Sequence, residues 1–593
     1  MPKKDRFADL RGPEDPVNIV HEAVLRDGVL ERYSQTELRR DAVSSAKFER
    51  KQATDEPAPT RRPAAKDKIH PLLAARMRRR GKSRIERVVI TYRDDFEIPR
   101  FPEPDLDQPR DCCDNERALE RADALVKEIE AERERGYAPL ERRLAGLEAV
   151  VEERFWLIKA LEVQMPLGAI GRLVADEEVL YVEPVETDDA PPQDDVVDGR
   201  ASIVSDPYFN LGLTSGWIGL LDTGLRRTHV VFNSPSHIDF MRDCVNGGAN
   251  CNTGTSLNPN DDCWDHGTSS AAIITANARQ GNAFRGVTGI TLDSFKVYPA
   301  GCGGLSATAA VNGFQRAVNV LDRVIVAEMQ AGGTETSSIS AAADSAYDAG
   351  AVVIAANGNN GPNASTVNVP AVAQKVLGIG AIDVKTLATP SYQSRGPAGD
   401  GRVKPDVQAP TNVETASNAG TTATQVFGGT SAATPEAAGA AALLRNFLRG
   451  TNTEFPPGNV YSHMIMSGTI AYPFNSTTGA GRLKLPVGGN YQYGSTSVTN
   501  GQTVEIPLTI AASGYQFNAA IWWPEVPATH NDVDLSLVDP SGTVRASSPS
   551  ASGVFERVSV NGPLAAGTWK LRIRGYSVTG SQQVFWSSTQ TTA

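Results

Sequence analysis

The segment Ile-Gly-Leu-Leu-Asp-Thr-Gly (218–224) is a short apolar run that ends in an aspartate and a glycine turn. Comparable apolar runs recur along the chain, separated by Ala-rich helical stretches, at Trp217–Leu221, Ser294–Tyr298, Val324–Met329, Ala351–Ala355 and Lys375–Ile382. This alternation predicts an α/β fold with a parallel sheet and helices on both faces. Chemistry in such sheets collects beyond the carboxyl ends of the strands, which is where Asp222 would lie.

Two further polar residues stand where small-residue helices begin. Asp-His-Gly-Thr-Ser-Ser-Ala-Ala-Ile-Ile (265–274) places His266 at one helix start, and Gly-Gly-Thr-Ser-Ala-Ala-Thr-Pro (428–435) places Ser431 in the first turn of another. A hydroxyl at the positive end of a helix lies beside backbone N–H groups that are free to bind an oxyanion. Taken alone, a serine at this position is most often only a helix cap.

Other enzyme classes explain these residues less well. Asp-Thr-Gly also occurs in aspartic proteases, but these need two such carboxylates and the chain has no second copy. Esterases and lipases need a Gly-x-Ser-x-Gly turn, which the surroundings of Ser431 lack. The order Asp, His, Ser along the chain is instead the subtilisin order.

On these motifs the sequence resembles the subtilases. Their Asp-Thr-Gly, His-Gly-Thr and Gly-Thr-Ser-x-x-x-Pro motifs stand here as 222–224, 266–268 and 429–435. The resemblance implies a serine endopeptidase that acts on polypeptides through Asp222, His266 and Ser431 and that needs no cofactor for catalysis.

The resemblance extends to further segments. The strand before Gly-Asn-Asn-Gly (358–361) maps the oxyanion-binding asparagine of the family to Asn359, whereas Asn357 is out of register. Two extended segments that hold the substrate backbone in the family correspond here to Gln330, Ala331 and Gly332, and to Gly303 and Gly304.

Some positions depart from the family pattern. Ser269 and Ser270 follow the His-Gly-Thr motif where His and Val are common, and Glu436 stands where His is usual. None of these changes removes a catalytic group. A peptide-binding protein built on an inactive scaffold is the non-enzymatic alternative, which labelling by a serine-directed fluorophosphonate would distinguish.

The N-terminal part has three segments. Residues 1–84 are polar and basic and predict a flexible arm, and residues 85–186 predict a small α+β, ferredoxin-like module with strands at 87–93, 155–163 and 179–185 and helices at 115–135 and 140–150. This module resembles a subtilase propeptide, which implies an intramolecular inhibitor and a self-processing zymogen; a permanently attached regulatory domain is the alternative. The acidic, Pro-containing stretch 187–205 predicts an exposed linker that contains the processing site.

The remainder is divided at about residue 488. Residues 206–487 form the predicted catalytic domain, and 488–593 alternate polar and apolar residues as in a β-sandwich. Asp532 and Asp534 are weak candidates for a structural calcium site, and a solvent-facing strand edge is the simpler interpretation.

Composition limits the setting of the protein. A net charge of −11 over 593 residues argues against nucleic-acid binding, and no apolar run is long enough to span a bilayer. The first residues lack the apolar core of a secretory signal. Four of the six cysteines, Cys244, Cys251, Cys263 and Cys302, cluster and suggest two disulfides, which favours an extracellular or periplasmic location over the cytoplasmic alternative.

Overall fold

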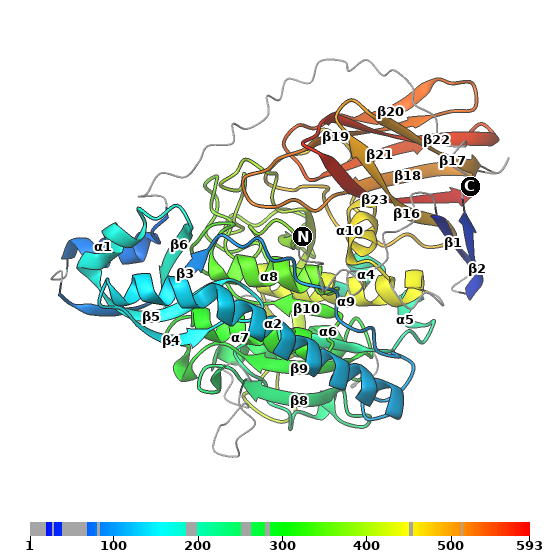
Figure 1. The fold of residues 1–593 in the computed structure, drawn as a ribbon. Helices are drawn as coiled ribbons and strands as arrows, with labels where there is room; N and C mark the ends of the chain where they lie inside the picture. The colour runs from blue at the N-terminus through cyan, green and yellow to red at the C-terminus, as the bar shows by residue number, and fades with distance from the viewer. Residues whose placement is uncertain are drawn as a thin grey trace.

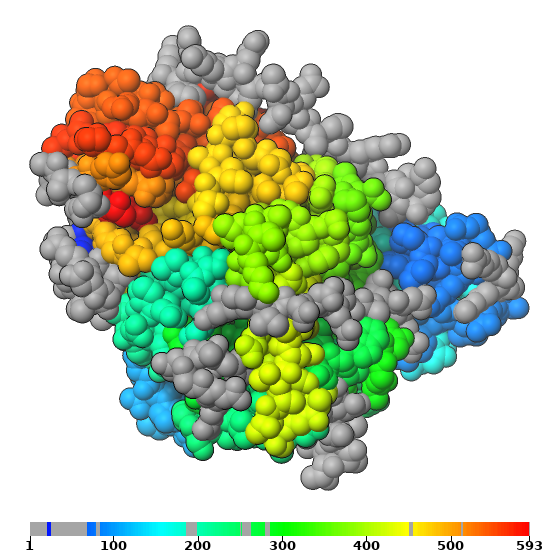
Figure 2. Space-filling view, turned by 180° about the vertical axis from the view of Figure 1, so that it is seen from behind, coloured from blue at the N-terminus to red at the C-terminus, as the bar shows by residue number. Residues whose placement is uncertain are grey.

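A computed structural model describes residues 19–26, 29–37, 68–79, 83–185, 199–248, 251, 263–278, 285–449, 455–510 and 514–592. Figure 1 shows a central helix-covered sheet with a small N-terminal module on one side and a β-rich C-terminal part on the other. Seen from behind in Figure 2, the central segments, green to yellow, lie between the orange and red C-terminal part and the blue N-terminal module. No helix of the described residues is long and apolar enough to cross a membrane.

The central sheet has seven parallel strands, as the alternating pattern predicts. Their order is β13-β12-β11-β10-β7-β9-β8. The strands are β7 (Trp217–Asp222), β8 (Ile238–Asp243), β9 (Thr291–Lys296), β10 (Val324–Ala327), β11 (Val352–Ala356), β12 (Leu377–Asp383) and β13 (Val407–Thr411). The prediction lacked β8 and β13, which are the two edge strands. An edge strand is paired on one side only, so it tolerates charged residues in β8 and a proline in β13.

Two pairs of helices cover this sheet on its two faces. α6 (His266–Thr275) packs against α9 (Gly429–Arg449), and α7 (Ala307–Asn319) packs against α8 (Ser338–Asp348). The short helices α4 (Gly199–Ile203) and α5 (Asp206–Phe209) also contact α9, and α4 lies inside the predicted linker. The rest of the predicted processing region, 186–198, lies outside the described residues.

The N-terminal module follows the ferredoxin-like order of strands and helices. The elements are α1 (Pro71–Arg79), β3 (Ile85–Tyr92), α2 (Cys113–Ala145), β4 (Val150–Arg154), β5 (Ala160–Pro166), α3 (Ile170–Leu173) and β6 (Val179–Pro184). The strands form an antiparallel sheet in the order β4-β5-β3-β6. This arrangement is the split β-α-β topology that the sequence predicts.

Two local predictions in this module were wrong. The helices expected at 115–135 and 140–150 are one continuous helix, α2, which runs through Pro139. Tyr137 is buried beside this proline and donates its hydroxyl to the carbonyl oxygens of Phe155 and Ile158, which anchors the helix where a break was expected. Residues 155–159, expected as part of one strand, connect β4 to β5.

The C-terminal part is a sandwich of two antiparallel sheets. One sheet has the order β17-β22-β19-β20, and the other has the order β2-β1-β16-β23-β18-β21. The strands are β16 (Gly489–Thr499), β17 (Thr503–Ile510), β18 (Gly514–Trp522), β19 (Asp532–Val538), β20 (Val544–Ser548), β21 (Phe555–Asn561), β22 (Gly567–Ser577) and β23 (Ser581–Thr592). Helix α10 (Pro457–Met466) packs beneath β18 and β23.

The second sheet corrects the prediction of a flexible arm over residues 1–84, in which two segments form strands. Strands β1 (Ile19–Arg26) and β2 (Val29–Glu37) extend this sheet, with β1 antiparallel to β16 (Figure 1). Val20 and Ala23 are buried in the core, and the ring of His21 stacks on Tyr493 at 4.9 Å. The sequence conceals this pairing because β1 lies between β2 and β16 and takes one row of its backbone hydrogen bonds from β16, which is distant in the chain.

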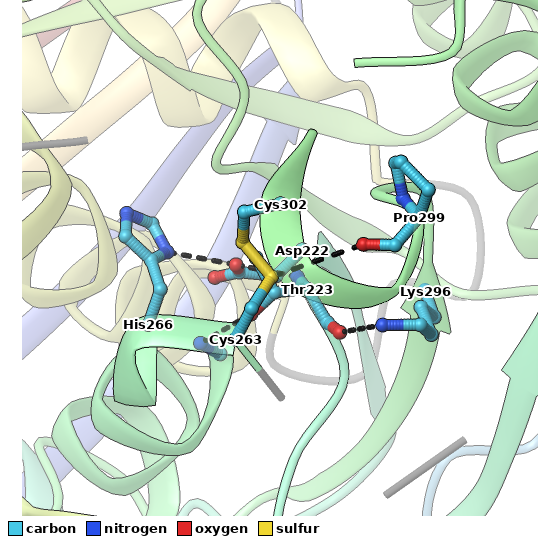
Figure 3. The surroundings of a disulfide bond; sticks show 8 residues. Asp222, Thr223, Cys263, His266, Lys296, Pro299 and Cys302 are labelled. Atoms are coloured by element: carbon cyan, nitrogen blue, oxygen red, sulfur yellow. Dashed lines mark hydrogen bonds and ion pairs between the residues drawn. A yellow bond between two sulfur atoms is a disulfide. The ribbon is translucent and has the colours of Figure 1, made fainter. Parts of the chain in front are cut away.

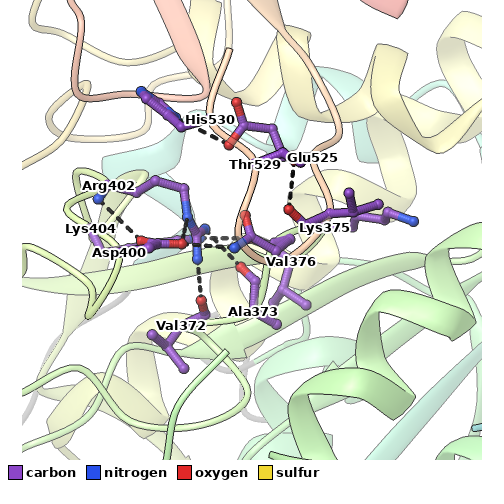
Figure 4. Close-up of polar contacts among 12 residues, drawn as sticks. Val372, Ala373, Lys375, Val376, Asp400, Arg402, Lys404, Glu525, Thr529 and His530 are labelled. Atoms are coloured by element: carbon purple, nitrogen blue, oxygen red, sulfur yellow. Dashed lines mark hydrogen bonds and ion pairs between the residues drawn. The ribbon is translucent and has the colours of Figure 1, made fainter. Parts of the chain in front are cut away.

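The loop before β13 joins the sandwich to the central domain (Figure 4). Arg402 is buried and donates hydrogen bonds to the carbonyl oxygens of Val372 and Ala373, at 2.6 and 3.0 Å. The backbone N–H of Val403 donates to Ser552 of the sandwich at 2.8 Å. The two predicted domains therefore share buried polar contacts.

Candidate active site

The carboxyl end of β7 meets the start of α6. His266 Nδ1 lies 2.7 Å from Asp222 Oδ1, which also accepts the N–H of Thr223 at 2.6 Å. Both side chains are buried: 0% of Asp222 and 3% of His266 are exposed. An imidazole whose Nδ1–H is held by a carboxylate presents its other nitrogen as a proton acceptor.

The connection between these two residues is tightly built. Gly267 donates its N–H to the Thr223 hydroxyl at 2.9 Å, and a Cβ on Gly267 would lie 1.9 Å from the carbonyl oxygen of Gly224. Only glycine permits this approach of the helix to the end of β7. The Cys263–Cys302 disulfide lies beside the pair in Figure 3, and Lys296 donates to the Thr223 carbonyl at 2.6 Å.

Ser431 enters the same region from α9. Gly429, with φ of 74°, makes the turn that begins the helix, and Ser431 is buried in its first turn. The ring of Phe427, just before this turn, meets the ring of His266 edge-on at 5.0 Å. Gln330 Nε2 donates to the Ser431 hydroxyl at 3.3 Å.

Asn359 is fixed so that its amide nitrogen remains available. Its Oδ1 accepts the N–H of Thr430 at 2.9 Å and the Thr430 hydroxyl at 3.2 Å. Its buried Nδ2 has no hydrogen-bond partner among the described residues. Asn357 instead uses its Nδ2 to bond the Ser394 carbonyl at 2.7 Å, so the two asparagines differ in the group they leave free.

The first predicted substrate segment, residues 330–332, lies next to Ser431 and Asn359. Gln330 bridges Ser431 and Asn359, because its Oε1 accepts the Asn359 N–H at 3.1 Å. Ala331 accepts the N–H of Val369 at 3.0 Å, which covers one edge of the segment. Gly332 accepts a hydrogen bond from His70 Nε2 at 2.8 Å.

The second segment borders the N-terminal module. Gly303 is exposed, Gly304 is buried with φ of 128°, and both come directly after Cys302. A few residues on, the N–H of Ala307 donates to the carbonyl oxygen of Val185 at 2.9 Å. The chain that leaves β6 is thus held beside this segment.

Sequence reasoning missed a carboxylate next to Asp222. Glu328 follows β10, and its backbone N–H bonds the Leu221 carbonyl at 3.1 Å. Burial and the charge of Asp222 raise the pKa of Glu328 well above its ordinary value. No sequence motif marks this residue, because its effect depends on the pairing of β10 with β7.

Asp532 and Asp534, the weak candidates for a calcium site, do not lie where the simpler interpretation expected them. Asp532 and Asp534 are not on a solvent-facing edge: both are buried on β19, which lies between β22 and β20. Among the described residues, no group of three or more His, Cys, Asp or Glu side chains is arranged to hold a metal ion. Structural calcium therefore stays a prediction.

Comparison with known proteins finds a family that matches the central part of the chain. The model of the subtilase family matches residues 215–483, which include Asp222, His266, Asn359 and Ser431. Subtilisin DY of Bacillus licheniformis is 32% identical over 231 residues, or 38% of this chain and 75% of that protein. Subtilisin E of Bacillus subtilis (strain 168) is 29% identical over 304 residues, or 50% of this chain and 72% of that protein. Serine protease AprX of Bacillus subtilis (strain 168) is 33% identical over 147 residues, or 22% of this chain and only 32% of that protein.

Proposed function

Because this chain belongs to the subtilase family of serine endopeptidases, we propose that it cleaves polypeptides through Asp222, His266 and Ser431. The observation that carries the proposal is the buried 2.7 Å contact of His266 Nδ1 with Asp222, in a site that also contains a buried serine at a helix start. An inactive binding scaffold has no need of an oriented imidazole there.

In the proposed mechanism Ser431 Oγ attacks the peptide carbonyl carbon while His266 Nε2 takes the hydroxyl proton. Asp222 holds the Nδ1–H tautomer and stabilises the imidazolium that forms. The imidazolium then gives its proton to the leaving amine as the C–N bond breaks, which leaves an acyl-enzyme. Water attacks the acyl-enzyme with His266 again as the base, and the carboxylic acid product is released.

Asn359 and the backbone N–H of Ser431 are the proposed donors to the tetrahedral oxyanion. The unpartnered Nδ2 of Asn359 supports this role, because a donor held without a ground-state partner needs no rearrangement when charge develops. Removal of one such donor typically costs about 3 kcal/mol of transition-state stabilisation.

We further propose that the module 85–186 is an intramolecular inhibitor and that the chain cuts itself between Val185 and Asp206. Supporting this, Val185 is hydrogen-bonded beside the segment of Gly303 and Gly304. His70, which precedes the module in the chain, bonds Gly332 on the other segment. Glu183 accepts the N–H and hydroxyl of Ser338 at the start of α8, at 2.7 and 2.6 Å. These contacts hold the module against the proposed cleft.

The intact mass of the protein tests catalysis and processing together. Purified wild-type protein is expected to lose about its first two hundred residues on incubation, whereas Ser431→Ala is expected to stay whole; this substitution typically costs on the order of 10⁶ in turnover. If both stay whole but a fluorophosphonate labels Ser431, the module is a permanent regulatory domain. If neither cleavage nor labelling occurs, the endopeptidase proposal is wrong.

The proposed location is outside the cytoplasm. This proposal is supported by the sulfur atoms of Cys244 and Cys251, and of Cys263 and Cys302, which lie at disulfide distance, because disulfides persist in oxidising compartments. Quantification of thiols in the denatured, unreduced protein is expected to detect only Cys112 and Cys113. Titration of six thiols would contradict this.

A further inference from the structure

The segment 97–112, here called the strap, connects β3 to α2 and crosses the catalytic domain far from the proposed cleft. Phe101 and Leu106 are buried, and the N–H of Phe101 donates to the carbonyl oxygen of Ala349 at 3.1 Å. Ala349 precedes β11, so the strap lies at the amino ends of the parallel strands. Asp222 lies at their carboxyl ends.

One strap residue supplies a cation to two buried acids of the catalytic domain. Arg110 Nη2 lies 2.6 Å from Asp293 Oδ2 and 3.2 Å from Asp322 Oδ1, and both aspartates are fully buried. The guanidinium carbon stands 4.5 Å from the ring centroid of Trp217 and 4.8 Å from that of Phe240. Arginine suits such a site because its planar group bonds carboxylates and stacks on rings together.

A second strap residue, Glu103, supplies an anion to two buried arginines of the catalytic domain. Glu103 lies 3.0 Å from the Nε of Arg323 and also pairs with Arg445, and both arginines are buried. Although burial acts to raise it, the charges of Arg323 and Arg445 lower the pKa of Glu103 below its ordinary value. The carboxylate therefore stays ionised between two buried cations.

Burial raises the pKa of Asp293 to about 6 and, together with the charge of Asp293, raises that of Asp322 well above its ordinary value, and the charge of Arg110 opposes both shifts. Arg242 and Arg316 also act on Asp293 and Asp322, but burial lowers the pKa of both arginines and neither forms an ion pair with these aspartates among the described residues. Without the strap, these two acids and two arginines would lose their closest partners of opposite charge. Removal of one partner from a buried ion pair is strongly destabilising.

We propose that the amino ends of β7, β9, β10 and β11 form a peptide-binding site for the strap, and that the strap stays bound there after the chain is cut between Val185 and Asp206. The site recognises an extended peptide that presents a carboxylate and a guanidinium on either side of apolar residues. The processed enzyme is then a two-chain complex in which the strap completes the catalytic domain. The two-chain state rests on the processing proposed above, whereas the site itself does not.

The contacts at the cleft and at the strap site are separate. His70 and Glu183 contact segments that follow the carboxyl ends of the strands, whereas Glu103 and Arg110 contact residues at the amino ends. Release of the cleft therefore does not require release of the strap.

The test uses Ser431→Ala full-length protein in which a site for an external, site-specific protease replaces part of residues 186–198. After cutting, the two fragments are expected to co-elute in native gel filtration at nanomolar concentration. Strands β1 and β6 also contact the rest of the molecule, so the decisive measurement is the change in dissociation constant for each variant. Arg110→Gln and Glu103→Gln are each expected to weaken binding at least about a hundredfold.

Two controls make the result specific. Arg117→Gln removes an exposed pair with Asp114 on α2 and is expected to change the dissociation constant less than about threefold. In a double-mutant cycle, Asp322→Asn is expected to cost much less in the Arg110→Gln background than in the parent, because the interaction between these two side chains is already lost there. This non-additivity would not arise from general misfolding.

Three results would overturn the proposal: fragments of the parent that separate at micromolar concentration, strap variants that bind as tightly as the parent, or additive effects in the cycle. Since an external protease makes the cut in an inert Ser431→Ala chain, these outcomes do not depend on self-processing. Failure of self-processing would appear only in the mass comparison of wild type with Ser431→Ala.

Discussion

Asn359 and Asn357 are two residues apart, yet the tertiary structure gives them different hydrogen bonds. The buried Nδ2 of Asn359 has no hydrogen-bond partner among the described residues, whereas the Nδ2 of Asn357 donates to the Ser394 carbonyl. Asn359 is proposed to act in the transition state, whereas the hydrogen bond of Asn357 belongs to the folded state, so substitutions at the two positions are expected to affect different measurements.

Asn359→Ala is expected to lower kcat about 100- to 1,000-fold with a small change in KM, because the lost bond forms only in the transition state. Asn357→Ala is expected to lower the free energy of unfolding by about 1–3 kcal/mol, since it leaves the buried Ser394 carbonyl unpaired. Steady-state kinetics and thermal unfolding of both Ser431-intact variants check this. Equal kcat losses in the two variants would contradict the assignment of Asn359.

Glu328 is expected to make stability pH-dependent. Burial and the charge of Asp222 raise its pKa well above 4.5, so the folded protein keeps a proton that the unfolded chain releases above that pH. Its contribution therefore favours unfolding as pH rises from about 4.5 towards the folded pKa, by up to about 1.4 kcal/mol per pH unit.

The variant Glu328→Gln removes this effect while it keeps the shape of the side chain. Its melting temperature is expected to exceed that of the parent by more at pH 8 than at pH 5, measured in the Ser431→Ala background to prevent self-digestion. An equal difference at both values would mean that Glu328 does not titrate in this way.

At the scale of elements, one disulfide joins the two segments that border the site. Cys263 precedes the start of α6, where Trp264 and Asp265 have positive φ of 62° and 60°, and Cys302 precedes the segment of Gly303 and Gly304. This loop closes over 39 residues, compared with 7 for Cys244–Cys251.

Substitution of both cysteines of one disulfide by serine is expected to lower the free energy of unfolding by a different amount for each of the two disulfides. Loss of Cys263–Cys302 is expected to cost about 4 kcal/mol of unfolding free energy and loss of Cys244–Cys251 about 2 kcal/mol, because the longer loop leaves more freedom in the unfolded chain. Denaturant unfolding of both double variants measures this. If the Cys263–Cys302 variant (Figure 3) lost less unfolding free energy than the Cys244–Cys251 variant, loop length would not explain the contribution of these bonds.

At the scale of the whole molecule, the sandwich and the catalytic domain share one hydrophobic core. Trp522 of β18 lies 4.8 Å from the ring of Tyr461 in α10 and 5.4 Å from Tyr347 in α8. The boundary near residue 488 is therefore a change in architecture within continuous packing.

The substitution Trp522→Ala is expected to lower the free energy of unfolding by about 3–5 kcal/mol, through the cavity that it leaves. The loss is expected in a single transition that also abolishes activity, because the shared core couples the two parts. Calorimetry of this variant beside Tyr515→Ala, which removes an exposed ring of the same strand, provides the comparison. A separate, unshifted transition for the catalytic domain would contradict the shared core.

The sequence alone determined the class of the fold and the residues of the candidate site. Buried parallel strands are locally apolar, and the turns that carry Asp222, His266 and Ser431 need glycine and small residues at fixed spacing, so both appear as short-range patterns. The ferredoxin-like module and the later strands of the sandwich follow from the same local signals.

Tertiary structure decided the features that depend on contacts between distant segments. Helix α2 continues through Pro139 because Tyr137 is anchored by residues beyond β4, and β1 becomes a strand because β16 offers an open edge. The charges of Glu103 and Arg110 look like ordinary surface charges in the sequence. They gain their roles only where the fold buries opposite charges against them, since the energy of an ion pair depends on burial and distance that no local pattern records.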